Sequence, residues 1–113
     1  MFGAEEGVLR RAALRELRRI RSDYRHGEDP RRLISDLSVL LRRLALGRSP
    51  RSQVAGLTGE AWLRYLDEAM GEDDFTHGPG RHIALSPYCA EPLSPVAADR
   101  TIDLVERWIR RAL

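Results

Sequence analysis

The sequence contains no lysine, because all 19 of its basic residues are arginine. This absence excludes Schiff-base chemistry and the phosphate-binding lysine of a P-loop. Cysteine is almost absent too: Cys89 stands alone, which excludes an internal disulfide and argues against a zinc ribbon or an iron–sulfur site. Chemistry that needs a lysine nucleophile or several thiols is therefore excluded.

Long apolar runs are also missing. No run exceeds three residues, whereas a helix that crosses a bilayer needs about 20. The sequence as given therefore predicts neither a membrane span nor the hydrophobic core of a signal peptide. We expect the chain as given to be soluble and intracellular.

The residues that are present are enough for one folded unit. A chain of 113 residues buries roughly two thirds of its unfolded surface. Its 42% hydrophobic and 32% charged residues are a globular composition. We expect residues 1–113 to form a single helical domain, with residues 1–7 as a remnant of trimming or a disordered start and residues 71–95 as an irregular loop.

Charge is unevenly divided along the chain. Residues 1–56 hold 13 arginines against 7 acidic residues, a net +6, and residues 57–113 hold 6 against 10, a net −4. The overall charge of +2 therefore hides a basic half and an acidic half. Such a distribution fits a docking surface, since complementary charge sets the register and the rate of association.

Four main helices are predicted by apolar residues that recur at intervals of three and four positions. Their expected ranges are about 5–25, 30–47, 59–70, and from 95 or 99 to near the C-terminus, with one further turn over 50–54. The second has an apolar face too broad for a single neighbour, so we place it at the centre of the core. The fold class is all-α, a small bundle of about four helices with a long irregular segment before the last.

Four helix starts carry a capping signal. Asp29 precedes Pro30, Ser49 precedes Pro50 and Ser94 precedes Pro95. Proline suits the first helical position because its missing N–H would have no intrahelical partner there. Thr58 is expected to cap the third helix.

The irregular segment at residues 71–95 holds three of the nine glycines and four of the six prolines. A loop this long tends to be functional or partly disordered. Its apolar residues are expected to hold it against the core; these are Phe75, Ile83, Leu85 and Tyr88. A short strand at 81–85 is the one regular element that its sequence favours, although no partner strand is evident.

Histidine and cysteine in this segment raise two hypotheses about chemistry. His77, His82 and Cys89 are ligand types that zinc accepts, but spacings of five and seven residues match no compact metal motif. A Cys-His nucleophilic pair would need an activated thiolate and an orienting third group. We expect surface histidines and a packed cysteine, hence no metal, no cofactor, no catalytic residue and no enzyme activity.

The stretch Gly78-Pro79-Gly80-Arg81 has the look of a phosphate-binding loop. It lacks the spacing of such motifs, and no strand clearly precedes it. We interpret it as a tight turn whose glycines allow positive φ.

An acidic run, Glu72-Asp73-Asp74, follows the third helix. Such a run is usually a solvated loop. The other interpretation is a contact with a cation or with an arginine-bearing partner.

The arginines of the first helix are the strongest polar signal. Arg11, Arg15 and Arg18 project to one side of it. Three interpretations compete: a solvated face, an anionic lipid surface and nucleic-acid phosphates. A helix-turn-helix fits residues 50–70 poorly, because three acidic residues accompany Arg64 on the would-be recognition helix.

Four stretches of the chain match the pattern of a known family. They are residues 10–17, the leucine-rich residues 33–46, residues 54–63 and Pro87-Tyr88, with residues 56–66 the most diagnostic. On them the chain resembles the soluble part of a bacterial family of unknown function. Its members are small single-span membrane proteins encoded beside MoxR-type AAA+ ATPases and von Willebrand factor A proteins.

The resemblance implies a non-enzymatic adaptor on the cytoplasmic side of the bacterial inner membrane. Its partner would be a MoxR-type ATPase or a von Willebrand factor A protein. The expected partner-binding residues are Arg11, Arg15, Arg18, Glu72, Asp73 and Asp74. The three carboxylates are expected to reach the metal ion that a von Willebrand factor A domain holds. The alternative is a small nucleic-acid-binding regulator that uses the arginine-rich first helix.

Overall fold

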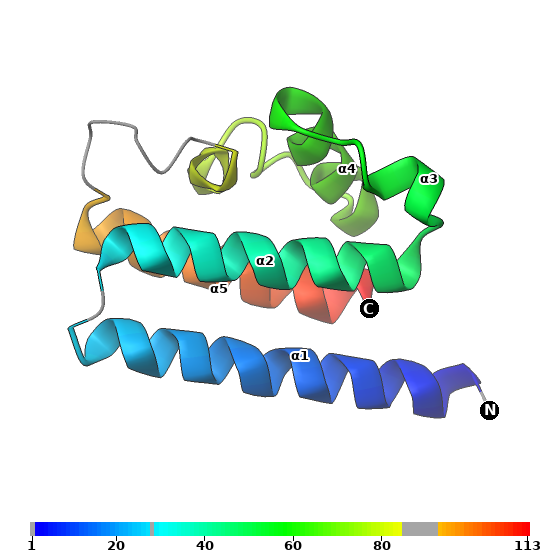
Figure 1. Cartoon of the computed structure of the whole chain (residues 1–113), viewed down its shortest axis with the longest axis horizontal. Helices are drawn as coiled ribbons and strands as arrows, with labels where there is room; N and C mark the ends of the chain where they lie inside the picture. The colour runs from blue at the N-terminus through cyan, green and yellow to red at the C-terminus, as the bar shows by residue number, and fades with distance from the viewer. Residues whose placement is uncertain (1, 28, 85–92) are drawn as a thin grey trace.

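The computed structural model describes residues 2–27, 29–84 and 93–113, with side chains from Gly7 onward. Helices are its only regular elements within these ranges (Figure 1), which confirms the all-α prediction. In chain order they are α1 (Phe2–Arg25), α2 (Pro30–Arg48), α3 (Arg51–Val54), α4 (Gly59–Met70), the 3-10 helix η1 (Pro79–Ile83) and α5 (Pro95–Ala112). None of the described helices is both long and apolar enough to cross a membrane.

The helices form three layers, with α2 and α5 side by side in the middle (Figure 1). The first layer is α1, which packs against both of them. The third layer holds α3, α4 and η1; α4 contacts α5, and η1 contacts both α2 and α5. The broad apolar face of α2 therefore lies at the centre, as its sequence predicts.

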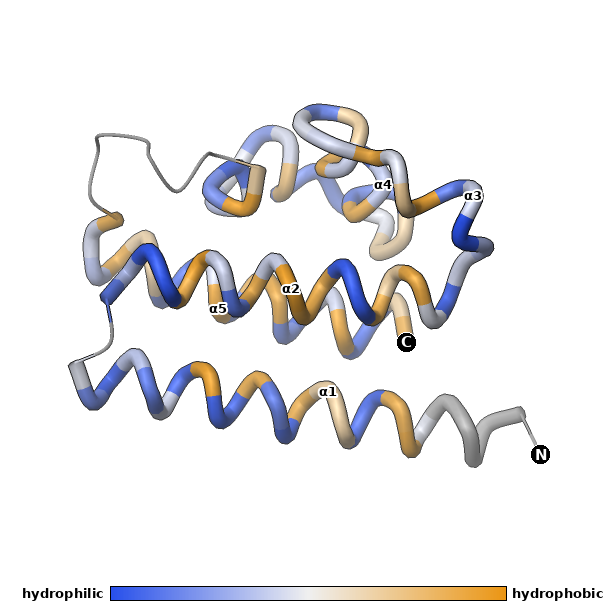
Figure 2. Tube along the Cα trace, in the orientation of Figure 1, coloured by the Kyte–Doolittle hydropathy of each residue, from blue (hydrophilic) through white to orange (hydrophobic). Residues whose placement is uncertain are grey.

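One hydrophobic cluster runs through all of these elements. Apolar residues recur along α2 and α5 on the sides that face their neighbours (Figure 2). Trp108 of α5 is fully buried, and its indole N–H donates to the carbonyl of Leu66 in α4 at 3.1 Å. Trp62 is also buried, at 3% exposed. The core therefore joins helices that are far apart in the sequence.

Two of the four predicted caps are confirmed, and the one at Ser49 is wrong because Pro50 occupies the N-cap position of α3. The Asp29 carboxylate accepts a hydrogen bond from the N–H of Arg31 at 2.9 Å, and the Ser94 hydroxyl accepts one from the N–H of Ala97 at 3.1 Å. Thr58 occupies the N-cap position of α4, but its side chain makes no capping hydrogen bond.

Helix ends depart from the predicted limits at two places. The first helix begins at Phe2 rather than near residue 5, so residues 2–7 are helical. The second ends at Arg48, one residue beyond Gly47. Gly71 stops α4 as predicted, because its positive φ of 74° is the left-handed conformation that ends many helices.

The predicted strand at 81–85 is wrong over its described part, because residues 79–83 form η1. Neither Gly78 nor Gly80 uses the positive φ that glycine allows in a turn. Gly80 instead allows close approach: a Cβ atom there would lie 2.6 Å from the Cα of Phe75. Phe75 and Ile83 are buried, as predicted. The expected core contacts of Leu85 and Tyr88 lie outside the described residues.

Candidate functional site

One flank of α1 is a line of exposed arginines. Arg11, Arg15 and Arg18 follow at intervals of four and three residues, and Arg25 continues the line seven residues later. An α-helix turns by about 100° per residue, so these spacings return to the same flank. We call the four residues the basic stripe; it extends over about 21 Å at 1.5 Å per residue. The sequence-based prediction did not include Arg25 in this line, although its distance of seven residues from Arg18 places it on the same flank.

The basic stripe has no carboxylate partner within the described part of the chain. The Arg11 Nε donates to the carbonyl of Gly7 at 3.2 Å. The neighbouring flank differs, because Arg19 there bonds Glu16 and also Asp23, the latter at 2.8 Å. The hydrogen bond from Arg19 is the main reason why the pKa of Glu16 lies below its usual value. Among the described residues of α1, the exposed arginines without a carboxylate partner are therefore those of the basic stripe. The half-buried Arg10 also has an Nε without a hydrogen-bond partner in this part of the chain.

The acidic run lies against the last helix. Glu72 Oε2 is 3.4 Å from Arg111 Nη1, and Asp74 Oδ2 is 2.8 Å from Arg107 Nη2. Asp73 is exposed, and among the described residues its carboxylate has no partner. Two of the three predicted carboxylates are thus engaged within the chain, and the structure places them away from the basic stripe.

The histidines do not form a metal centre with other described residues. His77 is exposed and His82 is half-buried, and Cys89 lies outside the described residues. Across residues 2–27, 29–84 and 93–113, no three histidine, cysteine, aspartate or glutamate side chains lie together where they would hold a metal ion. Arg81, at the end of the glycine-proline turn, bonds the carbonyl of Thr76 at 2.6 Å and pairs with Glu60 at 2.8 Å.

A buried carboxylate organises the loop that follows α4. Asp67 is 7% exposed and accepts hydrogen bonds from the N–H groups of Phe75 and Thr76, at 2.8 and 3.1 Å. It also accepts one from the Thr76 hydroxyl at 2.6 Å. All three of these hydrogen bonds come from residues 75 and 76, so the Asp67 carboxylate anchors this loop to α4.

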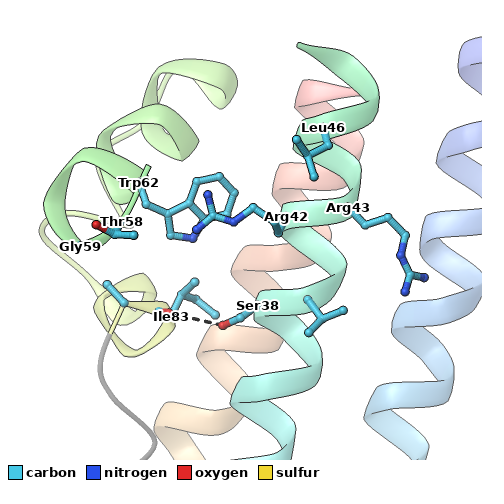
Figure 3. A pocket seen from close by; sticks show the side chains of 10 residues that line it. Ser38, Arg42, Arg43, Leu46, Thr58, Gly59, Trp62 and Ile83 are labelled. Atoms are coloured by element: carbon cyan, nitrogen blue, oxygen red, sulfur yellow. Dashed lines mark hydrogen bonds between the residues drawn. The ribbon is translucent and has the colours of Figure 1, made fainter. Parts of the chain in front are cut away.

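An open groove with a volume of about 620 Å³ runs along α2 beside α4 and η1 (Figure 3). We call it the α2 groove. It is lined by Ser38, Val39, Arg42, Arg43, Leu46, Thr58, Gly59, Trp62, Ile83 and Ala84. None of these ten residues is acidic. Val39 and Leu46 are seven residues apart, two helical turns, and therefore share the outward face of α2.

Arg42 crosses the groove to stack on Trp62, whereas Arg43 extends the other way, toward α1 (Figure 3). The Arg42 guanidinium carbon lies 3.8 Å from the centre of the Trp62 ring, and Nη1 donates to the carbonyl of Val54 at 3.0 Å. Burial lowers the pKa of Arg42, because it disfavours the charged form. In the part of the chain that the structure describes, no carboxylate compensates this cation.

The stack continues beyond Trp62. The rings of Trp62 and Tyr65 are parallel, with centres 5.7 Å apart and planes inclined by 7°. The Tyr65 hydroxyl bonds Ser49 at 2.7 Å and Arg48 at 3.2 Å. One side of the α2 groove is thus fixed by aromatic and cation–π contacts, which hold each ring and guanidinium in place.

Fold and surface together define a small all-α protein with a basic helix flank and an open groove. The chain belongs to the family described as Domain of unknown function (DUF4381), whose pattern matches residues 4–111. No curated protein and no solved structure matches the chain. Membership of a family of unknown function is thereby confirmed, while the membrane span and the genomic neighbours implied by the resemblance stay predictions.

Proposed function

We propose that this protein is a non-enzymatic adaptor whose basic stripe docks on an acidic surface of a partner protein. The observation that carries the proposal is the contrast in pairing between the basic stripe and the neighbouring flank of α1. Arg19 is neutralised within the helix, whereas no described carboxylate pairs with the basic stripe. Uncompensated charge of one sign on a rigid helix attracts and orients a partner of opposite sign.

The basic stripe supports the adaptor better than the acidic run does. Glu72 and Asp74 would have to release Arg111 and Arg107 before binding a metal ion on a partner. The basic stripe has no such pairs to break. We therefore expect Asp73 alone to add a contact from the acidic run.

The partner class follows from the family resemblance. We propose a MoxR-type ATPase or a von Willebrand factor A protein of the same genome, met at the cytoplasmic face of the bacterial inner membrane. A basic helix suits that face, because positively charged residues are retained on the cytoplasmic side.

Charge reversal of the basic stripe tests the adaptor. We expect Arg11→Glu/Arg15→Glu/Arg18→Glu to raise the Kd for the partner by at least about tenfold, and wild-type binding to weaken as salt screens it. The matched control is Arg51→Glu/Arg64→Glu/Arg100→Glu, which reverses three other exposed arginines. Biolayer interferometry against purified ATPase and von Willebrand factor A protein measures both.

Three outcomes would contradict this proposal. Equal losses in the two triple variants would mean that net charge matters and no surface is specific. Binding to anionic vesicles without either protein would make the basic stripe a lipid contact. Binding to duplex DNA with a log–log salt slope of about −0.9 per phosphate contacted would favour the nucleic-acid regulator.

A further inference from the structure

We propose that the α2 groove is a docking site for an acidic amphipathic helix of a partner protein. The groove is separate from the basic stripe, and the inference stands whether or not that stripe binds a partner. It depends on three properties of the groove: its exposed apolar ridge, its two arginines and its length.

The first property is apolar surface where the central helix reaches solvent. Val39 is 54% exposed although it lies in the middle of α2, and Leu46 is only half-buried. Ile83 and Trp62 border the same space. An apolar ridge flanked by charged residues is typical of a surface that another protein covers.

The second property is an uncompensated cation. Arg42 is half-buried, and one of its five N–H groups donates to the carbonyl of Val54. Its other N–H groups have no hydrogen-bond partner among the described residues. Stacking on Trp62 fixes its position before a ligand arrives. Arg43, on the other side of the ridge, is exposed and points toward α1, where its charge also helps to lower the pKa of Glu16. A carboxylate is the group that a partly desolvated, pre-oriented guanidinium binds best.

The third property is the length of the apolar ridge, which indicates that the ligand is a helix. Val39 and Leu46 are about 10.5 Å apart along α2, at 1.5 Å per residue. Anchors at positions i and i+7 of a docked helix span the same distance, with i+3 and i+4 between them. We therefore expect a helix whose apolar anchors cover the ridge and whose acidic residues reach Arg42 and Arg43.

A displayed library of peptides about 16 residues long, or four helical turns, tests the inference without a known partner. Selection on the wild-type protein should enrich peptides with apolar residues at i, i+3 or i+4, and i+7, and with flanking Asp or Glu. A synthetic peptide of the enriched sequence is then titrated by fluorescence anisotropy, and NMR shifts should centre on the Trp62 indole.

Two groove variants have matched controls elsewhere on the surface. Val39→Glu and Arg43→Glu should each weaken the selected peptide at least about tenfold, or 1.4 kcal/mol. Val96→Glu alters an equally exposed valine, at 61% against 54%, and Arg64→Glu an exposed arginine outside the groove. Both controls should bind like the wild type.

Several results would overturn the proposal. They are a library without binders, enriched peptides without acidic residues, and a Kd that neither groove variant changes. Dimerisation of the protein alone, lost in Val39→Glu, would assign the groove to a second copy of the chain. Loss of peptide binding only in Arg11→Glu/Arg15→Glu/Arg18→Glu would place the peptide on α1, which removes the groove inference and leaves the adaptor intact.

Discussion

Asp67 shows how one side chain organises a loop with no regular partner. Its carboxylate takes three hydrogen bonds from residues 75 and 76. At the same time its backbone carbonyl accepts from the N–H groups of Gly71 and Glu72, which close the end of α4. The same residue thus ends the helix and begins the loop that carries Phe75 into the core.

Replacing this carboxylate should destabilise the fold. We expect Asp67→Asn to lower the free energy of unfolding by about 2–4 kcal/mol, because an amide has one acceptor oxygen and turns its NH2 group toward buried N–H donors. Urea denaturation followed by circular dichroism measures the loss. Glu68→Gln, an exposed neighbour, is the control and should change stability by less than about 0.5 kcal/mol. A loss in Asp67→Asn no larger than in the control would contradict the anchor role.

At the scale of elements, the helix starts differ in how they are capped. The Ser94 hydroxyl accepts the N–H of Ala97 at the start of α5. Thr58 holds the equivalent position in α4 without such a bond. The two sites therefore separate the effect of the capping hydrogen bond from that of a hydroxyl residue at the N-cap.

Alanine substitution at each site measures the difference. Ser94→Ala should cost about 1 kcal/mol of stability, because the N–H of Ala97 loses its acceptor. Thr58→Ala should stay within about 0.5 kcal/mol of the wild type. Thermal unfolding by calorimetry under one buffer condition compares the two variants. Equal losses would show that the capping geometry at Ser94 contributes nothing of its own.

Most of the helices could be predicted from the sequence because their signals are local. Proline after Asp29 or Ser94 and apolar residues at helical intervals act within a few positions. The strand expected at 81–85 failed for a tertiary reason. Gly80 must approach Phe75 closely, and this contact favours the tight turn of η1.

The two candidate surfaces also differ in whether local sequence signals predict them. The flank of Arg11, Arg15 and Arg18 follows from helical spacing alone. The stacking of Arg42 on Trp62 does not, because it joins residues 20 positions apart, on two helices that the turn through α3 brings together. The α2 groove is therefore a product of tertiary structure, and no motif in the sequence marks it.

At the scale of the whole molecule, the basic and acidic halves of the chain meet between α1 and α5. Arg21 of α1 lies 3.5 Å from Asp103 and 3.8 Å from Glu106 of α5. Pairs this exposed contribute about 0–1 kcal/mol and weaken in salt. Burial of Leu17 and Ile20 must therefore supply most of the energy that holds α1 in place, at about 1.5–3 kcal/mol for each side chain.

This distribution of contacts predicts uneven protection along α1. Its first buried side chain from Gly7 onward is Ala13, whereas Val8 and Leu9 are 60% and 37% exposed. In α2, buried residues run from Leu33 to Ala45. Amide exchange is fast where few apolar contacts hold a helix and slow where opening requires global unfolding.

Hydrogen exchange read by NMR should therefore show a gradient along α1. Amides before Ala13 should exchange through local fraying, at rates insensitive to a core variant such as Leu41→Ala. Amides from Leu17 to Tyr24 should exchange with those of α2 and accelerate together in that variant, because the core holds both helices. Uniform protection along α1 would mean that its N-terminal turns are packed against another surface, such as a second copy of the chain.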